Sequence, residues 1–209
     1  MSVPVEVVRA DFNRIGRLTR GAELDRSNRL ALERIRPAPG SILEVGCGIG
    51  ALSERLEART RRLVAIDASP VMTRLTDRRC THTEVIEADV MTWQSRERFE
   101  TVVSVAMLHH VPLDVGLARL ASFVAPGGQL VIVDLFDAGY FAYSAVNVVL
   151  RMFRRPRHGG AELAAAWAEH AMHEHMPKLR DVRAACRRVL PDARVTRHLE
   201  WRYSIVSDC

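Results

Sequence analysis

ILEVGCGIG, residues 42–50, joins a short apolar run to three glycines at every second position. The apolar run predicts a buried strand, and the glycines predict a tight turn that leads into a helix. Glycine has no Cβ atom, so the backbone of such a turn can approach a ligand closely and present free N–H groups to it. The segment therefore indicates a loop that binds a nucleotide-like cofactor.

A pattern of strand, turn and helix repeats on the carboxyl side of this loop. Short runs rich in apolar residues predict strands at 42–45, 63–66, 84–87, 101–105 and 129–135. Helices are expected between them, up to about Arg59, from Ser69-Pro70 onward, and at about 114–124, before the turn Pro126-Gly127-Gly128. Buried strands that alternate with helices are typical of a parallel, doubly wound sheet of Rossmann-like type.

The segments on both sides of this core are predicted to be mainly helical. Residues 5–36 carry apolar side chains at helical spacing, and beyond Asp137 we expect helices at 140–153, 161–176 and 179–190 and strands at 193–196 and 201–206. These elements predict an α/β fold with a seven-stranded mixed sheet, an antiparallel last strand, helices on both faces and a helical lid insertion over the carboxyl edge. We expect one domain, 1–209, composed of N-terminal helices (1–40), a cofactor-binding core (41–137), the lid (138–178), and a final helix with antiparallel edge strands (179–209).

The composition fits one globular domain, with 209 residues of which 48% are hydrophobic and 26% are charged. No apolar run is long enough to span a membrane, and no apolar signal-peptide core is evident, so we expect a cytoplasmic protein without stable membrane insertion. The net charge of +5 arises in residues 138–209, which hold 12 basic and 7 acidic residues. Because 29 of the 30 basic residues are Arg, a bias that GC-rich codons also produce, we expect no nucleic-acid partner.

Two acidic residues discriminate between candidate cofactors. Asp67 ends the second predicted strand, 21 residues after Gly46, where doubly wound folds place the carboxylate that binds ribose hydroxyls. Gly46, Gly48 and Ala51 also satisfy the relaxed dinucleotide fingerprint, so the glycines alone leave an NAD(P)-dependent oxidoreductase open. Glu44, if it pointed into the site, would repel a pyrophosphate but stabilise a cationic ligand group. This residue favours S-adenosylmethionine over NAD.

Taken together, these segments resemble the class I S-adenosylmethionine-dependent methyltransferases over about residues 41–137. ILEVGCGIG is similar to the cofactor loop of that family, VAIDAS (64–69) to its ribose-binding strand end, EADV (87–90) to the segment beside the adenine, SVAMLHHVP (104–112) to its fourth-strand motif, and LASFVAPGGQLVIVD (120–134) to its last core helix, turn and strand. Five motifs in the same order are far more specific than one. The nearest group is that of small-molecule methyltransferases similar to those of quinone biosynthesis.

The resemblance implies which residues hold the cofactor. They come from four segments: Glu44, Gly46, Cys47, Gly48 and Gly50 around the methionine part, Asp67 and Ala68 at the ribose, Asp89 and Val90 at the adenine, and Val105 and Ala106 beneath the cofactor near its methionine end.

Methyl transfer is an in-line displacement at a sulfonium methyl group, so positioning can supply most of the catalysis. His109 and His110, after the fourth strand, are the candidate general bases for an acceptor that must lose a proton. No carboxylate cluster is evident around them, and we predict no metal site there. The helical region beyond contains His170, His173 and His175, for which we also predict no metal.

The acceptor is expected to be a small molecule, and its oxygen, nitrogen or carbon nucleophile stays open. The Asn-Pro-Pro-Tyr signature of amide-nitrogen methyltransferases is absent where Ser104-Val-Ala-Met107 stands. The predicted helix at 140–153 leaves three roles open: a lid, a contact in a homodimer, or a contact with a membrane surface. A subunit that binds the cofactor without catalysis of its own is a further alternative.

Overall fold

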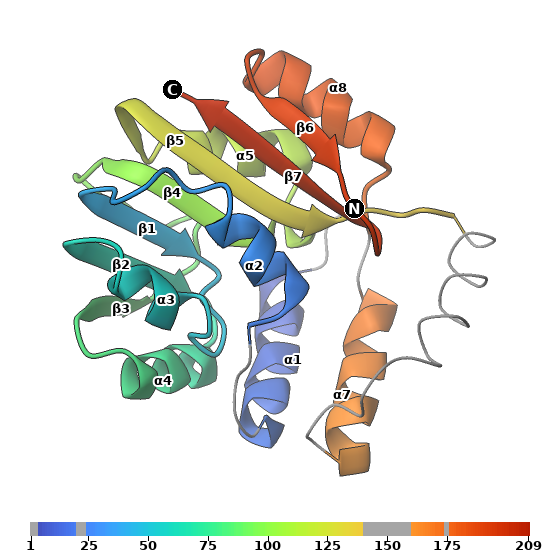
Figure 1. Ribbon diagram of the computed structural model, residues 1–209. Coiled ribbons are helices and arrows are strands. Elements are labelled where there is room, and N and C mark those ends of the chain that lie inside the picture. The colour runs from blue at the N-terminus through green and yellow to red at the C-terminus, as the bar shows by residue number, and fades with distance from the viewer. Residues whose placement is uncertain (1–3, 20–23, 140–159, 174–175) are drawn as a thin grey trace.

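A central sheet of seven strands organises the computed structural model (Figure 1), which describes residues 4–19, 24–139, 160–173 and 176–209. The strand order is β3-β2-β1-β4-β5-β7-β6. The strands are β1 (Ser41–Val45), β2 (Arg62–Asp67), β3 (Thr83–Glu87), β4 (Phe99–Val105), β5 (Val124–Leu135), β6 (Arg194–Arg197) and β7 (Arg202–Asp208). The predicted α/β class with a seven-stranded mixed sheet is confirmed.

The strand directions agree with the prediction. Strands β1 to β5 pair in parallel, β7 is antiparallel to β5, and β6 is antiparallel to β7. The antiparallel last strand is therefore confirmed, and the last two strands form an antiparallel edge in which β6 runs in the direction of β1 to β5. Tyr203 and Ile205 on β7 are fully buried, whereas β6 is largely exposed. The more apolar strand of this hairpin thus occupies the interior position, and β6 forms the edge.

Helices cover both faces of the sheet and one of its ends. The helices are α1 (Val5–Leu18), α2 (Arg26–Leu32), α3 (Ser53–Glu57), α4 (Pro70–Arg79), the 3₁₀ turn η1 (Leu108–His110), α5 (Leu113–Ala121), α7 (Gly160–His173) and α8 (Leu179–Val189). The α5 and α8 helices pack on one face, and α2 and α3 pack on the other. Helix α4 lies over β2 and β3. Its predicted start is confirmed, because the side chain of Ser69 accepts the N–H of Met72.

Alternation along the buried strands divides the core into two layers. On β1, Leu43 and Val45 face the α5 and α8 layer, whereas Ile42 faces α2 and α3. The same alternation turns the side chain of Glu44 to the α2 and α3 side, since it lies two residues after Ile42. On β5, it places Asp134 on the α5 and α8 side, opposite Tyr203 in the register of the two strands. The two polar side chains therefore lie on opposite faces of the sheet.

Several predicted boundaries are corrected. Helix α5 ends at Ala121 rather than at 124, because Phe123 accepts the N–H of Phe99 and Val124 already pairs with β4. The turn at 126–128 is an irregularity within β5, where the register against β4 jumps from Val124 to Gln129. The helix after the glycine loop is only the short α3. Helix α7 is described from Gly160 to His173, and the two residues that follow lie outside the described residues. The predicted helix at 140–153 lies outside the described residues.

Helices α1 and α7 lie side by side beyond the carboxyl ends of the parallel strands (Figure 1). Leu163 and Ala166 on α7 pack with Ile15 on α1 and Met72 on α4. In doubly wound folds, ligands bind at this edge. The two helices therefore stand next to the loop that the sequence singles out.

Candidate active site

The glycine loop connects β1 to α3 through three left-handed residues. Gly46, Gly48 and Gly50 have φ values of +78°, +56° and +76°, which residues with a Cβ atom rarely adopt. The N–H groups of Gly46 and Cys47 both donate to the carbonyl of Ile66 on β2, at 2.8 and 3.1 Å. The expectation that this loop presents free N–H groups is wrong for these residues, because the neighbouring strand already binds them.

The space around each glycine differs. A Cβ atom on Gly50 would lie 2.9 Å from the backbone of Thr76, and one on Gly46 would lie 3.1 Å from the side chain of Met107. A Cβ atom on Gly48 would meet no atom within 4 Å. Gly50 therefore lets the loop pack on α4, and Gly46 lets it pack on the segment after β4. Gly48 instead faces open space at the edge where a ligand can bind.

Asp67, at the end of β2, is bound to the loop. Its Oδ2 atom accepts the N–H of Gly48 at 2.9 Å, and its Oδ1 atom accepts the N–H of Ser69 at 2.8 Å. Burial raises the pKa of Asp67, against the effect of these two hydrogen bonds. A carboxylate offers about four acceptor positions, so Asp67 keeps capacity for ribose hydroxyls while it shapes the loop.

Glu44 lies beneath the loop rather than at its surface, since it is 3% exposed. Its Oε2 atom accepts the hydroxyl proton of Ser53, the first residue of α3, at 2.6 Å. Burial raises the pKa of Glu44 from 4.5 to about 8, the hydrogen bond from Ser53 lowers it, and the charge of Asp67 raises it. This contact connects β1 to α3, and the place of Glu44 beside the cofactor stays a prediction.

Cys47 fills space between the loop and α4. The thiol is buried, and the Thr76 hydroxyl lies 3.5 Å from its Sγ atom and donates to the carbonyl of Gly48 at 2.9 Å. Burial, first of all, raises the pKa of the Cys47 thiol well above its ordinary value. A thiol that stays protonated is a poor nucleophile, so Cys47 has the properties of a packing residue.

The segment predicted to bind adenine follows β3. Asp89 accepts the N–H of Met91 through its side chain at 2.9 Å, and its carbonyl accepts the N–H of Trp93 at 2.8 Å. Val90 is buried in the core, and its carbonyl accepts a hydrogen bond from Arg119 at 2.8 Å. Ala68 follows Asp67 directly, and the Asp67 carbonyl accepts the N–H of Ala88 at 2.9 Å. The last of these bonds joins the ends of β2 and β3.

The residues after β4 stand next to the loop. Val105 is half-buried, and Ala106 is exposed with a φ of +51°, an uncommon conformation for a residue with a Cβ atom. The Ala106 N–H donates to the carbonyl of Val133 on β5 at 2.9 Å. Because Met107 lies against Gly46, this segment and the glycine loop form one continuous edge.

His109 is fixed by Asp134 through two contacts. Its Nδ1 atom lies 2.6 Å from Oδ1 of Asp134, and its backbone N–H donates to Oδ2 at 2.9 Å. The side chains of His109 and Asp134 are 1% and 0% exposed. A carboxylate on Nδ1 sets the tautomer and the orientation of an imidazole, so His109 is a positioned histidine, not an exposed one.

His110 continues from this pair toward α1 and α7. Its ring centroid lies 4.0 Å from that of His109, 5.6 Å from that of Phe12 on α1 and 5.4 Å from that of His170 on α7. His170 is buried, and its Nδ1 atom lies 3.0 Å from Oδ2 of Asp11. The structure thus brings three histidines together at the carboxyl edge. The side chain of His173 and the whole of His175 lie outside the described residues.

Sequence reasoning missed two carboxylates of this site. Asp134 is the only charged residue in the predicted strand 129–135, a signal that could have marked it. Asp11 has no comparable signal, since it lies 159 residues from His170 in a helix that carries many polar side chains. Within the described ranges, no group of three His, Cys, Asp or Glu side chains could hold a metal ion.

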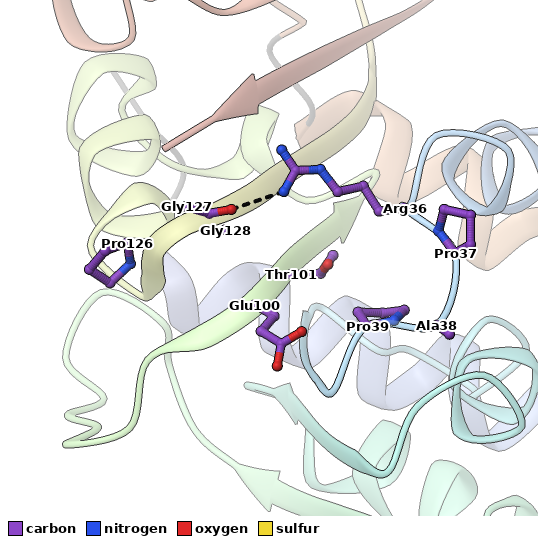
Figure 2. A pocket seen from close by; sticks show the side chains of 9 residues that line it. All are labelled: Arg36, Pro37, Ala38, Pro39, Glu100, Thr101, Pro126, Gly127 and Gly128. Atoms are coloured by element: carbon purple, nitrogen blue, oxygen red, sulfur yellow. Dashed lines mark hydrogen bonds between the residues drawn. The ribbon is translucent and has the colours of Figure 1, made fainter.

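A shallow pocket at the opposite edge of the sheet is not a second candidate active site. It lies at the amino ends of β4 and β5, opposite the glycine loop, and Figure 2 shows its lining residues, among them Arg36 and Glu100. Their polar groups bind the protein itself: Arg36 donates to the carbonyl of Gly127 at 2.9 Å, and Glu100 accepts the N–H of Gly40 at 2.8 Å. None of the helices in the described part of the chain is both long and apolar enough to cross a membrane.

Three features define the class of protein. The core is a parallel sheet with this strand order, a glycine loop follows β1, and a carboxylate stands at the end of β2. Together they are typical of an α/β protein that binds a nucleoside-containing cofactor. The open space beside Gly48 and the remaining acceptor capacity of Asp67 fit an adenosyl group with its ribose hydroxyls.

Comparison with known proteins narrows this class. A methyltransferase domain family matches residues 42–128. An uncharacterized methyltransferase of Mycobacterium tuberculosis is 30% identical over 168 residues, which cover 77% of this chain and 83% of that protein. Among solved structures, the complex of DhpI with SAM and HEP matches with a TM-score of 0.65 and 19% identity, over 97% of this chain and 94% of that one. The N-methyltransferase NodS of Bradyrhizobium japonicum, in complex with S-adenosyl-L-homocysteine, matches with a TM-score of 0.57 and 18% identity. The match covers 86% of this chain and 82% of that one.

The chain belongs to the class I S-adenosylmethionine-dependent methyltransferases. It is an enzyme whose cofactor is S-adenosylmethionine, as the sequence predicts. The alternative of an NAD(P)-dependent oxidoreductase is not favoured.

Proposed function

We propose that this methyltransferase acts on a small molecule whose nucleophilic oxygen or nitrogen carries a proton, and that His110 removes that proton. The observation that carries the proposal is the contact of Met107 with Gly46, which places the histidine turn against the cofactor loop. The relative named NodS is an N-methyltransferase, so a nitrogen acceptor has support as well as an oxygen acceptor.

The roles of the cofactor residues are part of this proposal. The methionine part of the cofactor lies against the glycine loop, at Gly46, Cys47, Gly48 and Gly50. Glu44 supports this loop from beneath. Asp67 with Ala68 binds the ribose, Asp89 and Val90 border the adenine, and Val105 and Ala106 lie beneath the methionine end. When bound, S-adenosylmethionine supplies an electrophilic methyl group on a sulfonium. We further infer that the chain is one catalytic domain, because α1 and α7 border the same edge as the loop.

The chain's own residues then have two tasks. His110 accepts the acceptor's proton, a role that typically accelerates a reaction by about 10² to 10⁴. His109, whose tautomer Asp134 sets, supports the ring of His110 at a centroid distance of 4.0 Å. The edge formed by the loop and the segment after β4 holds the two reactants in line, which supplies the remainder of the rate through orientation.

A comparison of two phenols tests the role of His110. Wild-type protein is assayed for transfer of a labelled methyl group to phenol, 4-nitrophenol, benzylamine and glucosamine at pH 8. Phenol keeps its proton at this pH, whereas 4-nitrophenol is already ionised and needs no base. We expect His110→Ala to reduce turnover of phenol by about 100-fold and that of 4-nitrophenol by less than about threefold.

The matched control is His82→Ala, which removes an exposed histidine before β3. It should leave both rates unchanged. Equal losses for the two phenols in His110→Ala would exclude a base and leave a packing role. Binding of S-adenosyl-L-homocysteine without transfer to any of the four acceptors would contradict the proposed acceptor class.

A further inference from the structure

The connection between β3 and β4 contains no helix. Residues 88–98, which the structure describes in full, form a turn and an irregular stretch between these two parallel strands. Parallel neighbours are usually joined through an α-helix, in which the backbone groups bind one another. Without a helix, the carbonyl groups of the connection need donors from elsewhere. The shape of this segment therefore depends on contacts with other parts of the chain.

The connection begins with a turn around Asp89. The carbonyl of Asp89 accepts the N–H groups of Thr92 and Trp93 at 3.1 and 2.8 Å, and its Oδ1 atom accepts the N–H of Met91 at 2.9 Å. All three bonds lie within the turn, residues 89–93. They hold its own curvature, but they do not attach the turn to the rest of the protein.

Arg119 on α5 makes that attachment. Its Nε–H group donates to the carbonyl of Val90 at 2.8 Å, and a terminal N–H group donates to the carbonyl of Trp93. The guanidinium carbon lies 4.5 Å from the ring centroid of Phe123, and this ring lies 5.2 Å from that of Trp93. Within the described part of the chain, the hydrogen bonds that connect the turn 89–93 to another element come from this one side chain.

Helix α5 does not need these bonds for its own packing. Leu117 and Leu120 already fix the helix in the core, since both are 0% exposed. The donors of a guanidinium are held in one rigid plane, so a side chain that binds two carbonyls also fixes their separation. The two bonds of Arg119 therefore act mainly on the turn and not on the helix.

We propose that Arg119 is a positioning residue for the adenine of the cofactor: it fixes the turn 89–93, and thereby the place of Asp89 and Val90. The inference rests on the adenine assignment in the proposed function and extends it to a residue outside the cofactor motifs. Met91 occupies the Oδ1 atom of Asp89, and a carboxylate has further acceptor positions. Oδ2 of Asp89 therefore has the capacity to accept the adenine amino group, provided that the turn holds it in place.

Two ligands that differ at one group test the inference. S-Adenosyl-L-homocysteine carries the adenine amino group, whereas S-inosyl-L-homocysteine carries a carbonyl oxygen in its place. We expect wild-type protein to bind the adenosyl compound at least about tenfold more tightly by calorimetry, the size of one hydrogen bond to a carboxylate. Asp89→Asn keeps an oxygen for the N–H of Met91 and replaces the other oxygen by a donor. It should reduce the preference to below about threefold.

Arg119→Met removes both donors and keeps an unbranched apolar stem beside Phe123. It should reduce the preference to below about threefold, chiefly through weaker binding of the adenosyl compound, because Asp89 is no longer held in place. Arg119→Lys can donate to one of the two carbonyls and should restore the preference in part. The matched control is Arg188→Met, which removes an exposed arginine bound to Asp114 on the same helix and should leave both affinities unchanged.

Hydrogen exchange of the protein without ligand measures positioning directly. In Arg119→Met, peptides that cover residues 89–93 should exchange faster than in wild type, while those of β1 and β4 should exchange at the wild-type rate. Thermal unfolding of each variant, measured in parallel, identifies any that fail to fold. If Arg119→Met is among them, Arg119→Lys supports the same comparison with a smaller expected change.

The outcomes separate this inference from the adenine assignment. Equal affinity of wild-type protein for the two compounds, or an unchanged preference in Asp89→Asn, would contradict the assignment, and the role of Arg119 would fall with it. A preference that Asp89→Asn abolishes and Arg119→Met leaves intact would overturn the role of Arg119 alone. Equal losses for both compounds in Arg119→Met, or unchanged exchange at residues 89–93, would also overturn it and leave the assignment standing.

Discussion

The carboxylate of Asp67 accepts the N–H of Gly48 at 2.9 Å, so the proposed ribose-binding residue and the cofactor loop form one unit. A second backbone N–H, that of Ser69, binds the other carboxylate oxygen at 2.8 Å. Replacement of Asp67 therefore affects the empty loop as well as the ligand.

Asp67→Asn and Asp67→Ala should differ for this reason. Asn keeps one carbonyl oxygen for one of the two N–H groups, whereas Ala leaves both without this acceptor, at a cost of about 1 to 3 kcal/mol for each buried group. We expect both variants to lose at least tenfold in affinity for S-adenosyl-L-homocysteine, by calorimetry, and only Asp67→Ala to lose several degrees in melting temperature. Unchanged affinity in Asp67→Asn would exclude the ribose assignment.

Two glycine variants should separate ligand binding from folding. Gly48→Ala adds a Cβ atom that meets no protein atom within 4 Å, so it should cost only about 1 to 2 kcal/mol for the left-handed backbone and yet greatly weaken cofactor binding. Gly50→Ala adds a Cβ atom 2.9 Å from the backbone of Thr76 and should cost about 2 to 4 kcal/mol. Urea unfolding and calorimetry measure both quantities. The assignment of the open side of the loop to the ligand is wrong if Gly48→Ala binds like wild type.

Glu44 should make the stability of the protein fall as the pH rises. Its pKa is about 8 in the folded chain and 4.5 ordinarily, so between these values the folded state binds more protons than the unfolded state. The linkage relation then predicts that its contribution to stability is present below pH 4.5 and is lost progressively up to about pH 8. Glu44→Gln should flatten this decline in urea unfolding measured from pH 5 to 9.

Ser53→Ala is the matched variant for that experiment. Its hydroxyl donates to Glu44 and lowers the pKa of that group, so its removal should extend the decline in stability to higher pH. The same slope in wild type and in Glu44→Gln would show that Glu44 is not the group responsible.

His109 and Asp134 should be strongly coupled in a double-mutant cycle. Loss of one partner from a buried pair leaves the other uncompensated, at a cost of about 3 kcal/mol, so the two alanine variants should be far from additive, with a coupling of about 1 to 3 kcal/mol. Arg188 and Asp114 form an exposed pair at 2.8 Å and provide the control, with a coupling below about 1 kcal/mol. Additive effects at His109 and Asp134 would remove the basis for a positioned imidazole.

Features carried by local sequence could be predicted. The glycine loop, the position of Asp67 at the end of β2 and the succession of strands and helices along the chain follow from short motifs and their spacing, because a β-strand, a turn and a helix leave periodic signals within a few residues. The order of the last two strands in the sheet, with β6 outside β7, could not be predicted in this way, since it depends on which strand of the last hairpin is apolar enough for the interior position.

Contacts between distant segments left weaker signals. The pairing of His109 with Asp134 spans 25 residues, and that of His170 with Asp11 spans 159. Both depend on how helices meet the edge of the sheet, which no local periodicity encodes. The binding of the loop N–H groups by Ile66 likewise depends on the register of β1 against β2.

The hydrogen bonds between the loop N–H groups and the carbonyl of Ile66 affect the kinetics of cofactor binding. A loop whose N–H groups already have partners before any ligand arrives does not have to order itself during the encounter, so little chain entropy is lost at that moment. The association rate should then depend on diffusion and access, and should vary little among loop variants that fold. Differences in affinity between such variants should appear almost entirely as shorter residence times of the nucleoside.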